Sequence, residues 1–570
     1  MAVGRLIWLE NPNAVTTAKK YRTLKLHPDD NVIVALEDLP QNETVHCEGV
    51  AYHLPHGVAA KHKFITEERA PNDPVRMYGV LVGKATRLIK RGEALTTFNL
   101  KHDAQGYSVP QKKPYLWPGL DVEKWQKRTF MGYHRADGRV GIRNYWLVIP
   151  MVFCENRNIA VMKDAFEREL GFAQPETYRN QVRQMVNALI NNDLNAIDAA
   201  QLEPEIDRRN ALHRTLFPNV DGIKFLTHDM GCGGTNQDSH ALNKLFAGFV
   251  ANPNVAGVTV LSLGCQKSQF DDLMLEINQH DPGFAKPVLY FDQQTYGSEQ
   301  AMMSVAIRDT FKGLIEINLH QRQPAPLSKL NVGLKCGGSD GFSGLSANPA
   351  VGHLSDVLGC LGGTTLLAEF PELCGVEQEL INRCESIDSA HKFVELYDQY
   401  AQQAVAANAG FDMNPSVGNI KDGLITDAIK SAGAAKKGGS APITGVLDYA
   451  EQPTKSGLHL LCTPGNDVLA TTGMAASGAN IILFTTGLGT PTGNPVTPTV
   501  KISTNTRLAQ KMADIIDFDS GTIIAGHQSI EQNAEALLEW LIELASGGHQ
   551  THAERLGQDD FIPWRRGVNL

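Results

Sequence analysis

The sequence predicts an α/β protein in which a small, strand-rich N-terminal unit precedes a large region built on a parallel sheet. Two observations support this prediction. From about residue 132 onwards, apolar runs of strand length alternate with helical segments such as Asn180–Leu189 and Gln237–Val250, as in βαβ units. Before residue 103 the chain has only short β-type runs, separated by polar or proline-containing turns. A chain of 570 residues also exceeds one hydrophobic core, so several domains are expected.

Shifts in composition divide the chain into four segments. The short runs 31–36, 62–66 and 77–83 predict strands of an N-terminal β domain. A stretch that contains proline, lysine and tryptophan without any period follows, and we interpret it as a linker. Two α/β domains complete the chain. The predicted segments are the β domain, the linker, the middle domain and the C-terminal domain, at residues 1–102, 103–131, 132–325 and 326–570.

Two internal stretches interrupt the α/β pattern. Residues 172–220 are polar and rich in Asn, Asp, Glu and Arg, and we interpret them as a helical insertion on the surface or at a subunit contact. Residues 431–441 combine alanine, glycine, serine and lysine. We interpret this second stretch as a break before a final α/β portion.

Composition and charge exclude several partners. The chain has 52 basic and 62 acidic side chains and no long run of Lys and Arg, so no nucleic-acid partner is expected. No stretch approaches the roughly 18 apolar residues of a membrane span, so no membrane partner is expected either. The nine cysteines show no tight spacing, and the N-terminus lacks the features of a signal peptide. We therefore expect a cytoplasmic protein with reduced thiols.

Four cysteines follow apolar runs that look like buried strands, and three of them sit against glycine. They are Cys154, Cys232, Cys265 and Cys336. Ligands gather at the carboxyl ends of parallel strands, so the four thiols predict a shared, metal-assisted site. Thiolates spread over a sheet edge suit a mononuclear ferrous site or an iron–sulfur cluster, whereas structural zinc is disfavoured because no Cys-x₂-Cys pair occurs. The alternative is that each cysteine is a packed core residue.

Two further segments place polar groups at the ends of predicted strands. The glycines of the loop Gly337–Asp340 allow backbone amides to hold an anion, while Ser339 and Asp340 supply a hydroxyl and a carboxylate. Glu369 and Glu372 end another buried run and could bind a hard cation or move a proton. The alternatives are a tight turn for the loop and helix N-terminal carboxylates for the two glutamates.

Two more candidates carry weaker signals. His228 precedes Cys232 by four residues, so its imidazole could be a metal ligand, a base or a structural residue. The loop Gly487–Pro495, which contains Thr490, follows a predicted strand. Its prolines interrupt the helix start that a dinucleotide needs, so it is interpreted as a carboxylate cradle or a simple connection.

Several longer motifs occur in the order found in a known family. They include Gly132–Asn144, the His-x-x-Gly-Cys motif at 228–232, Gly264-Cys265 and Cys336–Gly344. On these motifs the chain resembles the altronate/galactarate dehydratase family from residue 132 to the C-terminus. The front unit resembles the family's SAF, or β-clip, domain through His27–Asn31 and His62-Lys63.

The resemblance implies a hydro-lyase that acts on sugar acids and needs Fe²⁺, or a similar ion such as Mn²⁺, under reducing conditions. It also implies a β-clip domain, a dimerising middle region, hence a homodimer, and a Rossmann-like C-terminal region. The stretch Phe370–Leu380 and the tail Arg566–Leu570 resemble altronate more than galactarate dehydratases. The expected reaction is dehydration of D-altronate to 2-dehydro-3-deoxy-D-gluconate in galacturonate catabolism. Alternatives are galactarate or another aldarate or aldonate as substrate, or a non-catalytic sugar-acid sensor.

Site roles follow from the motifs and this chemistry. His228 is the first candidate for the base that removes the C2 proton, with Asp340 and Glu369 as further catalytic candidates. The residues expected to bind substrate are His62, Lys63, Gly337, Gly338, Ser339 and Thr490, and those expected to bind metal are Cys154, Cys232, Cys265 and Cys336. Two features depart from the family pattern, because residues 172–220 are longer than usual and Gln266 stands where Glu is common.

Overall fold

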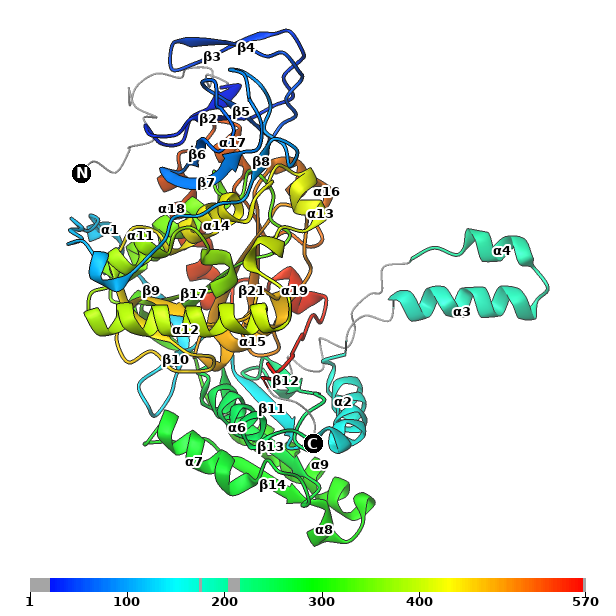
Figure 1. Ribbon diagram of the computed structural model, residues 1–570. Helices are drawn as coiled ribbons and strands as arrows, with labels where there is room; N and C mark the ends of the chain where they lie inside the picture. Colours follow the sequence, from blue (N-terminus) through cyan, green and yellow to red (C-terminus); the bar gives the residue numbers. More distant parts are fainter. Residues whose placement is uncertain (1–20, 174–176, 203–215, 567–570) are drawn as a thin grey trace.

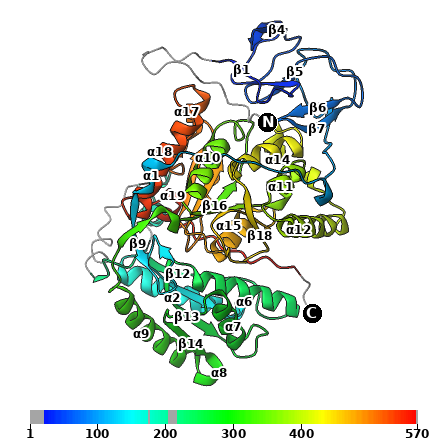
Figure 2. The same cartoon turned by 90° about the vertical axis from the view of Figure 1, so that its left-hand side faces the viewer.

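The computed structural model describes residues 21–173, 177–202 and 216–566. Figures 1 and 2 show three units stacked on one another, with the N-terminal strands at one end. A seven-stranded parallel sheet occupies the centre and a four-stranded parallel sheet lies at the far end. The predicted α/β class with a small N-terminal β unit is therefore confirmed. Within the described residues, no helix has the length and apolar character that crossing a membrane requires.

Short antiparallel strands build the N-terminal unit, in the sheets β1-β2-β5, β3-β4 and β6-β7-β8. The strands are β1 (Thr23–Leu24), β2 (Val32–Ala35), β3 (Thr44–Cys47), β4 (Val50–His53), β5 (Lys63–Ile65), β6 (Pro74–Met77), β7 (Val80–Ala85) and β8 (Leu100–Lys101). The run 77–83, interpreted as one strand, is in fact a hairpin. It turns at Tyr78 and Gly79, which have φ of 59° and 79°, and a left-handed turn of this kind ends a strand.

The linker runs along the central unit and is fixed to it at several points. The Tyr107 hydroxyl donates to Asp398 over 2.6 Å, and the Tyr115 hydroxyl donates to the Ser440 carbonyl over 2.6 Å. The short helices η1 (Val109–Gln111) and α1 (Glu123–Gln126) lie within the linker, and its predicted end at 131 already belongs to strand β9 (Thr129–His134).

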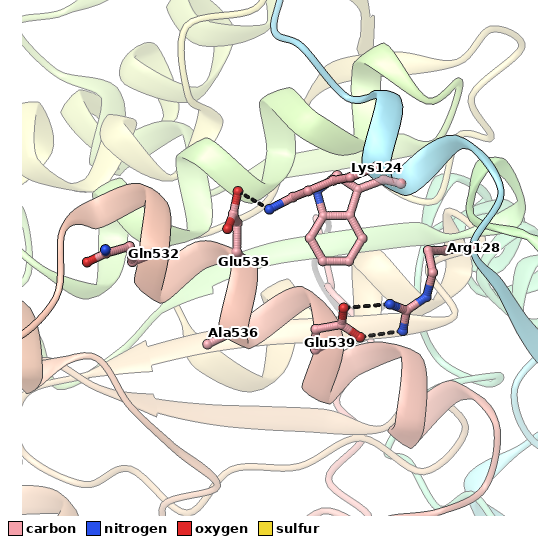
Figure 3. Close-up of a pocket in the computed structure, with 7 residues that line it drawn as sticks. Lys124, Arg128, Gln532, Glu535, Ala536 and Glu539 are labelled. Carbon is pink, nitrogen blue, oxygen red and sulfur yellow. Dashed lines mark hydrogen bonds and ion pairs between the residues drawn. The ribbon is translucent and has the colours of Figure 1, made fainter. Parts of the chain in front are cut away.

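Helix α1 packs against α18 (Ile530–Ala545) around a surface hollow of about 380 Å³ (Figure 3). Lys124 pairs with Glu535, and Arg128 donates to Glu539 over 2.6 Å. The charges that line this hollow neutralise one another, and these ion pairs attach the linker to α18.

The second unit is a parallel sheet in the order β12-β11-β13-β14. Every residue of β11 and β13 is buried, as expected for near-continuous apolar runs covered on both faces. A small antiparallel sheet, β10-β9-β15, flanks it. The elements are β10 (Val140–Gly141), β11 (Tyr145–Pro150), η2 (Phe153–Glu155), α2 (Asn156–Leu170), β12 (Gly222–Phe225), α6 (Asn236–Ala251), β13 (Val255–Ser262), α7 (Phe270–His280), β14 (Val288–Asp292), α8 (Gln293–Tyr296), α9 (Glu299–Ile317) and β15 (Gln323–Pro326).

The predicted insertion contains α3 (Thr177–Ile190) and α4 (Leu194–Ala199), which Figure 1 shows standing away from the sheet. Residues 174–176 and 203–215 of this insertion lie outside the described residues. Helices α3 and α4 expose several large apolar side chains, namely Tyr178, Val182, Val186, Leu189, Ile190 and Leu194.

The third unit is built on seven parallel strands in the order β18-β19-β17-β16-β20-β21-β22. The strands are β16 (Asn331–Cys336), β17 (Thr364–Ala368), β18 (Ile443–Leu447), β19 (Gly457–Leu461), β20 (Ile481–Thr486), β21 (Thr499–Ser503) and β22 (Phe518–Asp519). Strand β16 pairs with β17 on one side and β20 on the other, so the chain order reverses between β16 and β20. A crevice at the carboxyl ends of these strands is expected at such a switch point.

Helices surround this central sheet, and two of them lie where the sequence predicts a break. They are η3 (Leu327–Lys329), α10 (Ala347–Cys360), η4 (Phe370–Leu373), α11 (Glu377–Arg383), α12 (Ile387–Ala406), η5 (Phe411–Met413), α13 (Val417–Lys421), α14 (Asp427–Ala435), η6 (Lys436–Gly438), α15 (Asp467–Ala476), α16 (Thr506–Lys511), α17 (Gly521–Ile524) and α19 (His552–Arg555). The stretch 431–441, interpreted as a break, falls on buried α14 and η6. Its small residues permit close packing: a Cβ at Gly352 of α10 would lie 2.1 Å from the Lys436 carbonyl oxygen.

Candidate active site

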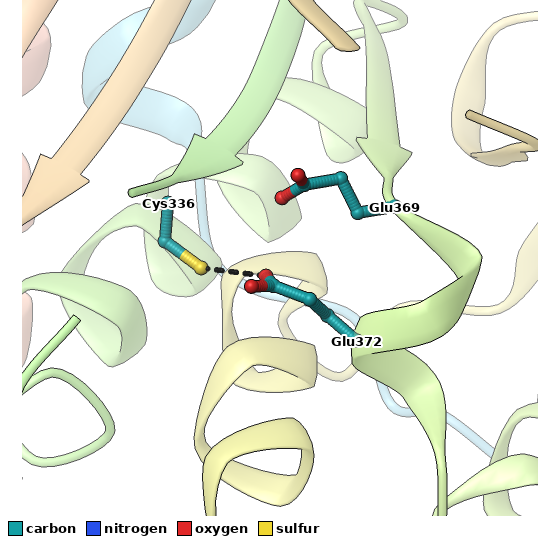
Figure 4. Close-up of side chains that lie close together, drawn as sticks. All are labelled: Cys336, Glu369 and Glu372. Carbon is teal, nitrogen blue, oxygen red and sulfur yellow. Dashed lines mark hydrogen bonds between the residues drawn. The ribbon is translucent and has the colours of Figure 1, made fainter. Parts of the chain in front are cut away.

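A thiol and two carboxylates meet at the switch point of the central sheet. Cys336 is the last residue of β16, Glu369 follows β17 and Glu372 lies in η4, and all three are buried. Cys336 Sγ lies 2.9 Å from Glu372 Oε2, and one potential ligand atom from each residue lies within 4.8 Å of the others (Figure 4). We call these three residues the acid–thiol cluster. Among the described residues, no other group of three His, Cys, Asp or Glu side chains is so close.

An unusual backbone conformation turns both carboxylates into the crevice. Glu369 has φ 70° and ψ 80°, a left-handed conformation that is uncommon for a residue other than glycine. Its backbone N–H donates to Thr463 Oγ1 over 3.0 Å. In Figure 4, both carboxylates point toward Cys336. Such strain persists only where the surroundings hold it, and it is common at functional sites.

Three buried lysines, which we call the ammonium set, face this cluster. Lys335 Nζ lies 2.7 Å from Glu369 Oε2 and 2.6 Å from Asp467 Oδ1, at the start of α15. Lys335 directly precedes Cys336 on β16, and its ammonium group reaches Glu369.

The other two lysines come from α14 and η6. Lys430 Nζ lies 3.0 Å from Glu372 Oε1. Lys437 Nζ donates to Cys336 Sγ over 2.7 Å and lies 3.8 Å from Glu372 Oε2. Glu372 is thus neutralised by two ammonium groups, whereas Glu369 has one that it shares with an aspartate.

This asymmetry separates the two carboxylates electrostatically. Burial and the nearby charge of Glu372 raise the pKa of Glu369 to about 8, against the opposing effect of Lys335. Burial would also raise the pKa of Glu372, but Lys430 and Lys437 lower it well below its ordinary value. Burial and Glu372 raise the pKa of the Cys336 thiol to about 11. Paired acids whose pKa values are pushed apart are typical of sites that transfer protons.

The donor set fits a divalent metal ion. With Glu369 and Cys336 protonated, the ammonium set faces two carboxylates, those of Glu372 and Asp467, so the crevice carries one positive charge in excess. A divalent ion held by Glu372 and Cys336 would displace the thiol proton and add one net positive charge, which a bound substrate carboxylate would balance. A thiolate and carboxylates are donors to several divalent ions. Metal affinity should therefore depend on pH, because binding releases protons.

The loop after β16 forms the next part of the crevice. A Cβ at Gly337 would lie 2.4 Å from Asp467 Oδ1, and one at Gly338, where φ is 58°, would lie 2.8 Å from Thr490 Oγ1. Glycine is therefore required at both positions. The Ser339 hydroxyl is buried and has no hydrogen-bond partner in the described part of the chain. The predicted binding residues of the 337–339 loop and Thr490 thus lie together.

The N-terminal unit covers this loop through strand β5. Lys61 Nζ lies 2.9 Å from Asp340 Oδ2, and Asp340 is fully buried. Lys63 Nζ donates to the Gly423 carbonyl over 2.7 Å, and His62 Nε2 lies 3.0 Å from the Lys421 carbonyl. Burial lowers the pKa of Lys63 to about 7, although Asp340 opposes the shift. Asp340, His62 and Lys63 therefore join the two units at the crevice.

The other predicted metal ligands lie elsewhere. Cys154, Cys232 and Cys265 are exposed and follow β11, β12 and β13 of the four-stranded sheet. The four thiols do not share one edge, because β16 belongs to the seven-stranded sheet. The single four-cysteine site predicted from the sequence is not formed.

His228 also lies in the second unit, where its ring contacts backbone groups. Its Nδ1 accepts from the Met230 N–H over 3.0 Å, and Nε2 lies 2.8 Å from the Pro150 carbonyl oxygen. Burial lowers the pKa of His228, which keeps the ring neutral. With both ring nitrogens engaged, we do not assign His228 as the base.

Sequence reasoning missed five charged residues of the crevice. They are Lys61, Lys335, Lys430, Lys437 and Asp467. One signal was available: Lys335 interrupts an apolar strand run, and a buried lysine requires anionic partners. Lys437 gave no such signal, because it lies in the stretch 431–441, whose composition is typical of a linker, and Lys430 directly precedes that stretch.

The fold and the crevice define an α/β enzyme whose reactive groups are a thiol, paired carboxylates and ammonium ions. Family models match nearly the whole chain. The altronate/galactarate dehydratase SAF domain matches residues 21–103, the D-galactarate dehydratase/altronate hydrolase second domain matches 132–318, and the D-galactarate/altronate dehydratase C-terminal domain matches 327–569. The chain belongs to the altronate/galactarate dehydratase family.

Curated relatives agree with this family over nearly their full length. The chain is 32% identical over 555 residues to an altronate dehydratase of Bacillus subtilis (strain 168). This match covers 96% of the chain and 99% of the relative. It is 32% identical over 547 residues to the altronate dehydratase of Escherichia coli (strain K12), with 96% and 99% covered. It is 29% identical over 544 residues to the galactarate dehydratase (L-threo-forming) of Escherichia coli (strain K12), with 94% of each covered.

Proposed function

We propose that the protein is a hydro-lyase that converts D-altronate to 2-dehydro-3-deoxy-D-gluconate and water. The main support is the acid–thiol cluster, in which two adjacent carboxylates have pKa values shifted in opposite directions. Similarity to two altronate dehydratases favours altronate over galactarate as the substrate. The same reaction places the protein in galacturonate breakdown.

Glu369 is the proposed proton-transfer group. Its pKa of about 8 lies near the working pH, where a general acid or base is most effective. As carboxylate it takes the proton from C2 of the substrate. It then returns this proton to the leaving C3 hydroxyl, which departs as water, and the enol product tautomerises to the 2-keto acid. Lys335, 2.7 Å away, holds the carboxylate in position.

The substrate carboxylate is proposed to bind at the 337–339 loop. Backbone amides there and the free Ser339 hydroxyl offer hydrogen bonds, and the excess positive charge of the crevice favours an anion. Cys336 and Glu372 would hold a divalent ion, whose chemistry is to polarise the substrate carboxylate and so acidify the C2 proton.

An assay of the full-length protein under anaerobic conditions tests this function. Protein loaded with Fe²⁺ or Mn²⁺ is mixed with D-altronate, galactarate and other aldonic and aldaric acids, and 2-keto acid formation is measured. We expect the highest kcat/KM for D-altronate, loss of activity with chelator, and a roughly 10²–10⁴-fold lower kcat in Glu369→Gln. A higher kcat/KM for galactarate would overturn the substrate, and no keto acid from any sugar acid would overturn the hydro-lyase.

The proposal has three further parts, which concern the fold of the third unit, the oligomeric state and the cellular compartment. We propose that the third unit is a Rossmann-like variant, since its strand order reverses beside β16. A homodimer would cover the exposed apolar side chains of α3, and replacing Val182 and Val186 by glutamate should then yield monomers in light scattering. The nine unpaired cysteines favour the reducing cytoplasm as the compartment.

A further inference from the structure

Three of the nine cysteines are exposed, and all three lie on the second unit. Cys154, Cys232 and Cys265 are exposed, whereas the other six are buried or half-buried. Free cysteine is ordinarily among the most buried residue types, so three exposed thiols on one sheet are not packing residues. We propose that Cys154, Cys232 and Cys265 bind an iron–sulfur cluster at the carboxyl edge of the four-stranded sheet. This site is separate from the crevice that carries the proposed function.

The sheet order brings the three cysteines to neighbouring positions. Strand β11 pairs in parallel with β12 on one side and β13 on the other. Cys154 follows β11, Cys232 follows β12 and Cys265 follows β13. Neighbouring strands lie about 4.8 Å apart, so the three strand ends span roughly 10 Å.

Backbone hydrogen bonds join the three cysteine-bearing loops. The Phe153 N–H donates to the Met230 carbonyl over 3.1 Å, and the Lys267 N–H donates to the Gly231 carbonyl over 2.9 Å. Lys267 Nζ also donates to the Gly234 carbonyl over 2.7 Å. The segment before Cys232 therefore lies between the other two loops and touches both.

Two polar side chains secure the Cys232 loop to the end of β11. His228 contacts the Pro150 carbonyl through Nε2 and the Met230 N–H through Nδ1. Asn156, two residues after Cys154, donates from Nδ2 to the His228 carbonyl over 2.7 Å. The Cys232 loop is thus fixed to the segment around Cys154 through both the ring and the backbone carbonyl of His228.

Glycine beside the thiols permits this close approach. Gly231 has φ 95°, and a Cβ there would lie 2.2 Å from the Met151 carbonyl oxygen. Gly264, which precedes Cys265, has φ 102°, and its Cβ would lie 2.9 Å from Asp292 Oδ2. A larger residue at Gly231 would push the Cys232 loop away from the loop that carries Cys154, whereas one at Gly264 would collide with Asp292 at the end of β14.

The spacing of the donors favours a cluster over a single ion. A mononuclear site with metal–sulfur bonds of about 2.3 Å needs its donor atoms within roughly 4.6 Å of one another. Over the described ranges of the chain, no group of three donor atoms within 4.8 Å includes any of these cysteines. In an iron–sulfur cluster each thiolate binds a different iron, which holds the sulfurs farther apart. Three thiolates leave one iron of a four-iron cluster without a cysteine ligand.

The charge around the thiols is compatible with such a cluster. Lys267 and Arg565 line the small hollow at Cys232. Asp238 lines the same hollow, and Arg565 pairs with the Asp229 carboxylate over 3.2 Å and donates to the Asp229 carbonyl over 2.8 Å. Lys267 is therefore the cation beside Cys232 that would offset part of the negative charge of the thiolates and the cluster.

Reconstitution of the full-length protein with ferrous iron and sulfide under anaerobic conditions tests the proposal. Iron and acid-labile sulfide are measured per chain after desalting, together with visible absorbance. We expect about four of each per chain in the wild type. Each of Cys154→Ser, Cys232→Ser and Cys265→Ser should lose at least nine-tenths of the bound sulfide. The matched control Cys360→Ser should retain it all.

The outcomes separate this site from the crevice. Cys336→Ser should keep the cluster, whatever its effect on activity, because Cys336 belongs to the other sheet. Unchanged circular dichroism in the three serine variants would show that they fold. A colourless wild type whose three thiols stay open to alkylation would overturn the proposal. So would tight binding of one Zn²⁺ by the three thiols without uptake of sulfide.

Discussion

The carboxyl ends of β11, β12 and β13 lead to three exposed thiols, whereas those of β16 and β17 carry one buried thiol between two carboxylates. Both edges look alike in sequence, since each has cysteine and glycine after an apolar run. They differ in what packs over them. Buried α14 and η6 supply two lysines to the central edge, while the other edge keeps its loops open to solvent. Burial with paired charges favours proton transfer, and exposed thiols favour binding of an external group.

The largest effect should come from removing a buried charge at the central edge. Glu372→Gln leaves Lys430 and Lys437 without their shared carboxylate, and an uncompensated buried charge costs about 3–5 kcal/mol. Urea unfolding of the metal-free protein measures the loss. A change below about 1 kcal/mol would show that solvent reaches these lysines, and the contrast between the two edges would fail.

The second effect concerns pH and sharpens the role of Glu369. Its pKa of about 8 in the folded protein exceeds its ordinary value of 4.5, so the folded state holds a proton that the unfolded chain has released. Stability of the metal-free wild type should therefore fall as pH rises from about 5 to about 8.

Glu369→Gln serves as the control for this slope. The substitution should abolish the part of the pH-dependent fall in stability that Glu369 causes. That part is on the order of 1.4 kcal/mol per pH unit between about pH 5 and about pH 8. Asp427, whose pKa burial raises to about 8, remains in both proteins and cancels in the difference. Identical pH slopes in the two proteins would mean that Glu369 is ionised throughout.

A smaller effect is expected where the N-terminal unit meets the crevice. Lys61→Ala removes the ammonium group 2.9 Å from the buried Asp340 carboxylate. Because Asp340 keeps hydrogen bonds from the Phe342 N–H and the Ser343 hydroxyl, we expect a loss below that of Glu372→Gln, about 1–3 kcal/mol, and a roughly tenfold lower kcat/KM. Lys25→Ala, on the outer side of the same unit, is the matched control. An unchanged kcat/KM would show that this contact does not support the crevice.

The smallest effect should appear at the exposed edge. In metal-free protein, Cys265→Ser should change the free energy of unfolding by less than about 0.5 kcal/mol, as surface substitutions do. Cys336→Ser should cost about 1–3 kcal/mol, because it alters a buried group bonded to Glu372 and Lys437. Equal losses would erase the distinction between the two edges.

The fold class and the ends of the strands could be predicted from the sequence, because apolar runs mark buried strands directly. Cys336, Glu369 and the 337–339 loop were found in this way. Sheet membership could not be predicted, since it depends on long-range pairing, and Cys154 was therefore placed beside Cys336. Lys437 was missed for a different reason, because small residues that allow tight helix packing have the composition of a linker.

The linker contacts have a consequence for any detachment of the N-terminal unit. Tyr107 and Tyr115 anchor the chain to the central unit, and His102, directly after strand β8, accepts a hydrogen bond from the Ala428 N–H, so the unit would remain on a short tether. A short tether keeps a released module at a millimolar local concentration near its docking surface. After such a detachment, the contacts of Lys61 with Asp340 and of Lys63 with the Gly423 carbonyl would form again in a unimolecular step, which dilution does not slow. Cutting the chain at this tether would make the same step depend on protein concentration.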